Sequence, residues 1–137
     1  MESKPGNLEI LTSENAAKPA ATYSSATKVN FGDFSMIYCA GCIGMDPATS
    51  QLISDDVEEQ TRQAILNLKA ILEDNGSSLE NITRCNVFLT TMDNFTTMNK
   101  VYTEFFNTHI PARTAVAVYQ LPFNSLFEIQ ADATVKN

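Results

Sequence analysis

The sequence is short of histidine and of positive charge, and each shortage argues against a class of function. Its 137 residues include one histidine, and 9 Lys and Arg stand against 16 Asp and Glu, giving a formal net charge of -7. Proteins that follow nucleic-acid phosphates usually present a basic face, so an acidic chain argues against a nucleic-acid partner. A single histidine also argues against RNA cleavage, which usually needs two proton-transfer groups.

Membrane-spanning segments, a secretory signal and the common nucleotide-binding and hydrolase motifs are missing as well. No apolar run approaches the roughly 18 residues that a bilayer requires, and the first residues lack the basic and apolar regions of a secretory signal. Motifs of the types Gly-x-Gly-x-x-Gly, P-loop and Gly-x-Ser-x-Gly are also absent. The sequence therefore predicts a cytoplasmic protein with no membrane partner and no cofactor.

Cysteine is scarce, and the three that occur predict no metal site. Cys39 and Cys42 have CxxC spacing, but a zinc site of this kind needs about four ligands, and only Cys85 and His109 remain. Residues three apart on a strand also point to opposite faces. An odd number of cysteines favours reduced, buried thiols in the cytoplasm. We expect His109, near a helix end, to cap that helix rather than act as a base.

The apolar pattern predicts one domain over residues 1–137, with disorder confined to the first few residues. Alternation and β-forming residues predict a hairpin that turns at Gly32-Asp33, together with further strands. The expected strands cover residues 7–11, 26–31, 35–40, 83–91, 113–119 and 127–135.

Two segments have helical spacing. Residues 54–73 carry apolar residues on one side and charged residues on the other, with carboxylates at the start and Asn75-Gly76 as a left-handed stop. Residues 93–108 form the second predicted helix, closed by Pro111.

The resulting order is β-β-β-α-β-α-β-β, which predicts an α+β fold. Strand-helix-strand units imply parallel neighbours, and right-handed crossovers put both helices on one face of a six-stranded mixed sheet. The fold class is therefore a two-layer sandwich. Because apolar strand residues also fall on the uncovered face, we expect oligomerisation to bury that face or its edge.

Two charged residues in the last forty positions are candidate site residues. Arg113 opens one predicted strand, and its planar fork matches a carboxylate with two parallel hydrogen bonds; it could equally be a strand-edge arginine that reaches water. Glu128 opens the next strand and could equally belong to its polar face. Because these strands are antiparallel, Glu128 should fall level with about Val118, roughly 16 Å from Arg113. If both residues serve one pocket, two subunits must form it.

Three segments together resemble one known family. Residues 111–133, "PARTAVAVYQLPFNSLFEIQADA", resemble the pattern P-A-R, a β-rich stretch, L-P, five residues and E-I of the YjgF/YER057c/UK114 proteins, the Rid (reactive intermediate deaminase) family. Residues 22–49 resemble its PYSQA and SGQIGLDP-like segments, and residues 86–106 resemble its VFLTDMNDFxxxNxxYxxFF segment. The resemblance covers residues 20–135.

The resemblance implies a chorismate-mutase-like fold, homotrimers with clefts between subunits, and hydrolysis of enamines and imines such as 2-iminobutanoate and 2-iminopropanoate to 2-keto acids and ammonia. It implies no metal or cofactor. The family's carboxylate-binding arginine matches Arg113, and its water-associated glutamate matches Glu128. The implied substrate-binding positions are Tyr23, Ala40, Gly41, Asn99 and Ala115.

This chain departs from the family pattern at three positions. Thr22 replaces a proline, Ala40 stands where serine is frequent, and Ala115 stands where cysteine is frequent. These changes bear on the range of substrates more than on the reaction. Two other functions remain open: a regulatory protein that binds keto acids or amino acids without turnover, and the endoribonuclease or translation inhibitor that some family members are called, which the acidic charge disfavours.

Overall fold

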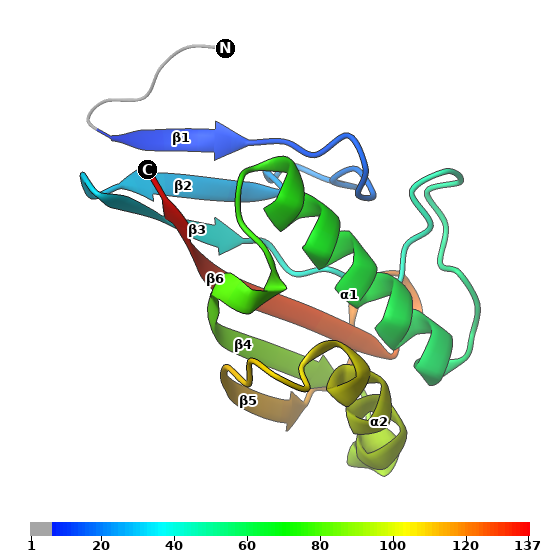
Figure 1. Cartoon of the computed structure of the whole chain (residues 1–137). Helices are drawn as coiled ribbons and strands as arrows, with labels where there is room; N and C mark the ends of the chain where they lie inside the picture. The colour runs from blue at the N-terminus through cyan, green and yellow to red at the C-terminus, as the bar shows by residue number, and fades with distance from the viewer. Residues whose placement is uncertain (1–6) are drawn as a thin grey trace.

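A computed structural model describes residues 7–137; the predicted disorder of the first few residues lies outside this range. The predicted element order is confirmed, with short 3-10 turns between some of the elements (Figure 1). The strands are β1 Leu8–Leu11, β2 Ala26–Asn30, β3 Phe34–Cys39, β4 Ile82–Leu89, β5 Ala112–Ala117 and β6 Phe127–Lys136. The helices are α1 Val57–Asp74 and α2 Phe95–Phe105.

The six strands form one mixed sheet in the order β1-β2-β3-β6-β4-β5. Only β4 and β5 pair in parallel, and the other neighbours are antiparallel. The expectation that every strand-helix-strand unit joins neighbouring strands is wrong for β3 and β4, because β6 lies between them and pairs with both. Strands β3 and β4, which α1 connects, therefore run in the same direction but do not pair with each other.

Helix α1 is held at both ends as its sequence predicts, although it begins later than expected. Asp56 is the N-cap, and its carboxylate accepts a hydrogen bond of 3.0 Å from the Glu59 amide. Asn75 ends the helix, and Gly76 follows with a φ of 84°, a left-handed conformation that glycine adopts at little cost. The apolar side of α1 lies on the sheet, beside α2 (Figure 1).

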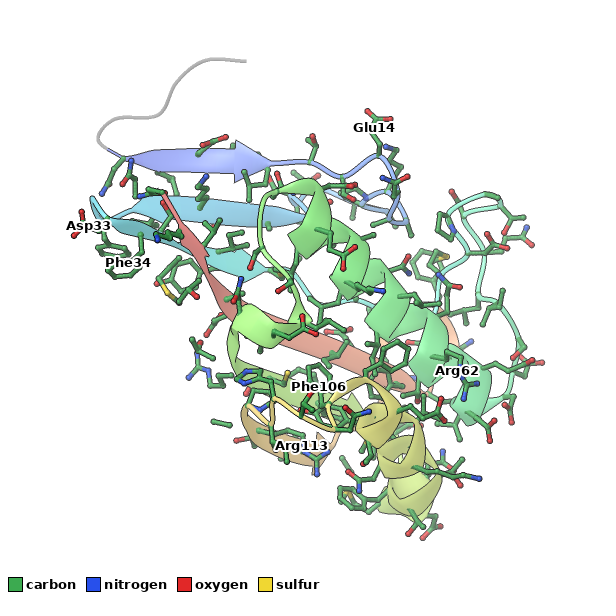
Figure 2. The ribbon with its side chains drawn as sticks, in the orientation of Figure 1. Glu14, Asp33, Phe34, Arg62, Phe106 and Arg113 are labelled. Carbon is green, nitrogen blue, oxygen red and sulfur yellow. The ribbon has the colours of Figure 1, made fainter. Side chains whose placement is uncertain are left out.

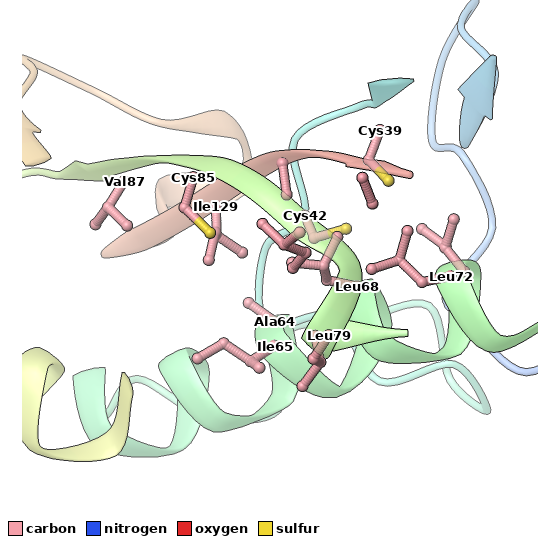
Figure 3. Close-up of a cluster of buried hydrophobic side chains, with 14 of the residues drawn as sticks. Cys39, Cys42, Ala64, Ile65, Leu68, Leu72, Leu79, Cys85, Val87 and Ile129 are labelled. Atoms are coloured by element: carbon pink, nitrogen blue, oxygen red, sulfur yellow. The ribbon is translucent and has the colours of Figure 1, made fainter. Parts of the chain in front are cut away.

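The buried core lies between α1 and the sheet, and all three cysteines are part of it (Figure 3). They are free and buried. The expectation that Cys39 and Cys42 face opposite sides is wrong. The chain leaves β3 after Cys39, and Cys42 pairs with Ile129 one residue out of the β3–β6 register, so both thiols point into the core.

Burial makes these thiols poor nucleophiles. It raises the pKa of Cys42 to about 12 and that of Cys85 to about 11, and it raises the pKa of Cys39 as well. We expect the native protein to react with a disulfide reagent at pH 8 at least 100-fold more slowly than the urea-unfolded chain, because almost no thiolate is present or accessible. Release of the reagent's chromophore measures both rates. Equal rates in the two states would contradict the burial of all three thiols.

The second helix ends earlier than predicted, and His109 does not cap it. Its last residue is Phe105, and the Phe106 amide bonds to the carbonyl of Tyr102. The His109 ring instead donates from Nε2 to the carbonyl of Ile82, at 2.6 Å, where β4 begins. In the part of the chain that the structure describes, no helix is both long and apolar enough to cross a bilayer.

Strand pairing assigns side chains to the two sheet faces. Arg113 is level with Cys85 and therefore lies on the face that the helices cover. Glu128 is level with Phe88, three residues further along β4, and lies on the opposite face. On that open face, Phe34, Tyr38 and Val116 are each more than 40 % exposed, so the apolar side chains there are not covered within one chain.

Candidate functional site

A cavity of about 380 Å³ lies where β3 ends and β6 begins. It has the size of small-molecule pockets. Tyr23, Ala40, Gly41 and Glu128 all line it, so one chain brings together four of the seven residues that the sequence singles out. The rest of its wall is mostly apolar: Ala17, Pro19, Ala20, Ile43, Met45 and Ile71.

Gly41 and Glu128 touch each other, and the contact explains why position 41 is glycine. A Cβ added to Gly41 would overlap the Glu128 carboxyl group, with 2.7 Å to its Cδ atom. Real Cβ atoms are not found this close to another heavy atom. The paired strands on either side fix both residues, since Cys42 and Ile129 exchange backbone hydrogen bonds of 2.7 and 2.9 Å. The carboxyl group therefore lies directly over the Gly41 backbone.

Burial raises the pKa of Glu128 above the usual range of a glutamate. No other cause contributes to the shift, and none of the salt bridges among the described residues includes Glu128. A carboxyl group of this kind in a cavity can exchange a proton closer to neutral pH than an exposed glutamate can. The cavity thus contains a carboxyl group without a cationic partner, among the described residues, that would hold it ionised.

Two glycines in this region give a matched pair of variants. Gly41→Ala should displace only the flexible end of Glu128, so we expect a folded protein whose activity is reduced at least 100-fold if that carboxyl group is catalytic. Gly44→Ala should instead push against the Gln60 backbone, where the added Cβ would lie 2.7 Å from Cα, and lower the free energy of unfolding by about 2 kcal/mol. Urea unfolding and initial rates separate the two effects. Full activity in Gly41→Ala would contradict the role of this contact.

The remaining site candidates lie in a second cluster on β5 and α2. The Arg113 guanidinium packs over the Tyr102 ring, 4.6 Å from its centroid, and near the Phe95 ring, at 5.5 Å. Its Nη1 donates a hydrogen bond of 2.7 Å to Oδ1 of Asn99. Ala115 follows on the same side of β5 and packs against the core. Figure 2 shows Arg113 on β5, beside α2, at the edge of the sheet.

The Arg113 guanidinium has no counter-ion among residues 7–137. The ion pairs in this range involve only Arg62 and Arg84. Its one hydrogen-bond partner in the described chain, the Asn99 amide oxygen, is neutral. A partly buried cation is stabilised by an anion, and the guanidinium of Arg113 can bind one that its own described chain does not provide.

The two clusters do not meet within one chain. Through β4, Glu128 is level with Val116, not with Val118 as the sequence predicts. Arg113 is three residues away along β5 and two strands across, about 14 Å at ordinary strand spacings. The two side chains also lie on opposite sheet faces. The predicted separation within a chain is therefore confirmed, with a shorter distance.

The comparison with protein families agrees with this fold. The family profile described as Endoribonuclease L-PSP matches residues 13–135. The chain belongs to the endoribonuclease L-PSP family. This is the family of the Rid or YjgF/YER057c/UK114 proteins, so the predicted resemblance is confirmed.

Named relatives cover nearly the whole chain. A RutC family protein of Pyrococcus horikoshii is 44 % identical over 91 % of this chain and 96 % of its own length. A 2-iminobutanoate/2-iminopropanoate deaminase of Dermatophagoides farinae is 30 % identical over 93 % of this chain and 96 % of its own length. The crystal structure of Escherichia coli TdcF with bound serine is 32 % identical, with a TM-score of 0.83 over 94 % of this chain and 99 % of that one.

In this L-PSP family member, sequence reasoning missed a buried amide that shapes the cavity. Asn67 of α1 donates to the carbonyls of Ile43 and Met45, at 3.2 and 2.8 Å, and accepts from the Ala17 amide at 3.2 Å. It thereby joins three segments of the cavity wall. A signal was present in the sequence, since Asn67 interrupts the apolar side of a clear helical pattern.

A second missed feature is the backbone conformation of the loop before β6. Phe123 and Asn124 have φ values of 59° and 56°, a left-handed conformation that is unfavourable for phenylalanine. The loop is fixed by a 2.7 Å hydrogen bond from the Leu126 amide to Oε1 of the buried Gln60. Phe123 lines the cavity and is 59 % exposed. Pro122 and Asn124 are turn residues, but no glycine marks the left-handed position at Phe123, so the sequence does not predict this conformation.

Proposed function

We propose that this protein hydrolyses 2-imino acids, such as 2-iminobutanoate and 2-iminopropanoate, to 2-keto acids and ammonia. The observation that carries this proposal is the pair of complementary groups: a guanidinium without a counter-ion and a carboxyl group of raised pKa in an apolar cavity. The first suits a substrate carboxylate, and the second suits proton transfer at an adjacent carbon–nitrogen bond. The named deaminase and the structure with bound serine, an amino acid, support the same choice.

The proposed site contains residues of two subunits. We propose a homotrimer in which Arg113 of one subunit approaches the cavity that holds Glu128 of its neighbour. Three facts support this arrangement: the roughly 14 Å between the two residues in one chain, their opposite sheet faces, and the exposed apolar side chains on the open face. Neither half of the site is sufficient, because each lacks the group that the other provides.

The reaction needs only positioning and proton transfer. Arg113 binds the substrate carboxylate and thereby holds the imine carbon near Glu128. Ionised Glu128 accepts a proton as water adds to the C=N carbon, and it returns that proton to the nitrogen. When the C–N bond breaks, the C=O bond forms, and the hydroxyl proton passes by way of Glu128 to the departing ammonia, which leaves as ammonium. One water molecule is consumed, and one 2-keto acid and one ammonium ion are produced from the protonated imine.

The cavity walls assist by excluding water and fixing the geometry. Tyr23 is 50 % exposed, and its hydroxyl accepts a hydrogen bond of 3.2 Å from the Ala20 amide, which holds the ring at the cavity wall. Ala40 provides no hydroxyl, so the backbone near Gly41 provides the polar contacts on that side. Burial also raises the pKa of Glu128, so its carboxyl group keeps the proton until the leaving nitrogen takes it. A carboxylate in water would bind the proton less tightly.

A coupled assay tests the proposal directly. Threonine dehydratase releases an enamine that tautomerises to 2-iminobutanoate, and we expect this protein to accelerate formation of 2-oxobutanoate beyond the spontaneous rate. Arg113→Ala should not accelerate it. A wild-type protein that binds 2-oxobutanoate but leaves the rate of its formation unchanged would exclude the deaminase and support a sensor of keto acids.

A further inference from the structure

The side chains around Arg113 determine which edge of its guanidinium is free. Nη1 is occupied by Asn99, at 2.7 Å. Among residues 7–137, no hydrogen bond or ion pair engages Nε or Nη2 of Arg113. These two nitrogens form one of the two edges on which a guanidinium binds a carboxylate through parallel hydrogen bonds.

Helix α2 fixes this orientation from one side. Phe95, Asn99 and Tyr102 have a spacing of four and three residues, so they lie on the same side of the helix. All three contact Arg113, two through ring faces and one through an amide oxygen. Arg113 extends from the edge strand β5, where the sheet itself provides no further neighbour. The helix is therefore what limits its rotation.

Tyr102 acts here through its ring and not through its hydroxyl. The side chain is 5 % exposed, and its hydroxyl is buried without a hydrogen-bond partner in the described structure. Burial raises the pKa of this hydroxyl above its usual value, and the neighbouring Cys85 thiol raises it further, so the group stays neutral. A neutral ring face 4.6 Å from the guanidinium provides cation–π attraction without competing for the positive charge.

We infer that Phe95, Asn99 and Tyr102 are positioning residues, which orient Arg113 so that its Nε–Nη2 edge binds the carboxylate of the substrate. Asn99 accordingly contacts Arg113 and not the substrate. The neutral acceptor is essential: a carboxylate at position 99 would be an internal counter-ion and would compete with the ligand. This inference rests on the proposed function for the identity of the ligand.

Four variants test it, with dissociation constants for 2-oxobutanoate from calorimetry and kcat and KM from the coupled assay. Tyr102→Phe keeps the ring and should match the wild type within twofold. Tyr102→Leu and Asn99→Ala should raise Kd and KM about tenfold and change kcat less than threefold, because each removes one oriented contact to the cation that binds the ligand. Asn99→Asp should raise KM further. A merely structural role would lower kcat through loss of folded protein and leave KM unchanged.

Nuclear magnetic resonance tests the edge itself. The Arg113 Nε–H signal, assigned by its loss in Arg113→Lys, should shift when 2-oxobutanoate binds. If Tyr102→Leu fails to fold, the kinetics of Asn99→Ala and this signal still test whether α2 orients Arg113. An unchanged KM in Asn99→Ala would overturn the inference. So would an Arg113 Nε–H signal that does not shift when 2-oxobutanoate binds. A wild type that binds 2-oxobutanoate without turnover would instead overturn only the proposed reaction; one that binds none would overturn both.

Discussion

Replacing Arg113 with alanine is expected to lower kcat/KM for 2-iminobutanoate by 100- to 1,000-fold, mainly through KM. The variant loses two charge-assisted hydrogen bonds to the substrate carboxylate, together worth about 3 to 4 kcal/mol. The Arg113 side chain is at the edge of the sheet, so its removal should leave the core intact. Steady-state kinetics and the Kd for 2-oxobutanoate measure the loss.

The matched control is Arg62→Ala. Arg62 pairs with Glu58 and Glu104 on the helix surface, at 3.6 and 3.0 Å, and is not in the proposed site (Figure 2). Exposed pairs of this kind contribute at most about 1 kcal/mol, so the control should unfold near the wild-type midpoint and keep its KM. Equal kinetics for the two variants would show that Arg113 does not bind the carboxylate. Arg113→Lys should fall between them, since an ammonium group cannot form the two parallel bonds.

Replacing Glu128 with glutamine is expected to lower kcat by 100- to 10,000-fold while KM changes little. Glutamine has the same shape and can still lie over Gly41, but it cannot take up and return a proton. The Kd for 2-oxobutanoate should be retained, because the carboxylate of the ligand is bound by Arg113. An active Glu128→Gln protein would contradict the assigned role of this residue.

The pH profile gives an independent test of Glu128. Water addition needs the ionised carboxylate, and burial raises its pKa above the ordinary glutamate value of 4.5. Activity of the wild type should therefore be lost as pH falls through that raised pKa, at a higher pH than for an exposed glutamate. Residual activity of Glu128→Gln should show no such acid limb. A wild-type profile that is flat down to pH 4.5 would contradict the burial of an ionisable base.

The sequence predicted the elements better than their arrangement. Helix α1 and the β2–β3 hairpin follow from local signals: regular apolar spacing, a capping carboxylate and glycine turns. The position of β6 in the middle of the sheet was not predicted. Residues 128 to 134 alternate between polar and apolar, a pattern that is typical of any strand with one solvent-exposed face. Its buried positions, among them Ala131 and Ala133, face the core beneath α1, and only the structure shows that β6 pairs with β3 and β4 at once.

The sequence predicted the site residues and the separation of Arg113 from Glu128, but not which of the other residues lie with each of them. The motif resemblance named Tyr23, Gly41 and Glu128, which one cavity brings together, and Arg113 and Asn99, which form the second cluster. The shift in register after β3 could not be predicted, because it depends on how the chain pairs with Ile129, a residue nearly ninety positions later. Long-range pairing of this kind leaves no local pattern in the sequence.

Subunit mixing tests the shared site most directly. Arg113→Ala and Glu128→Gln proteins, each nearly inactive, would be unfolded together in equal amounts and refolded, with each variant refolded alone as the control. Random reassembly should place an intact arginine beside an intact glutamate in about a quarter of the clefts and restore about a quarter of wild-type activity per subunit. Mixtures that stay as inactive as the separate variants, although mixed oligomers form, would show that the two residues do not act together across a subunit boundary.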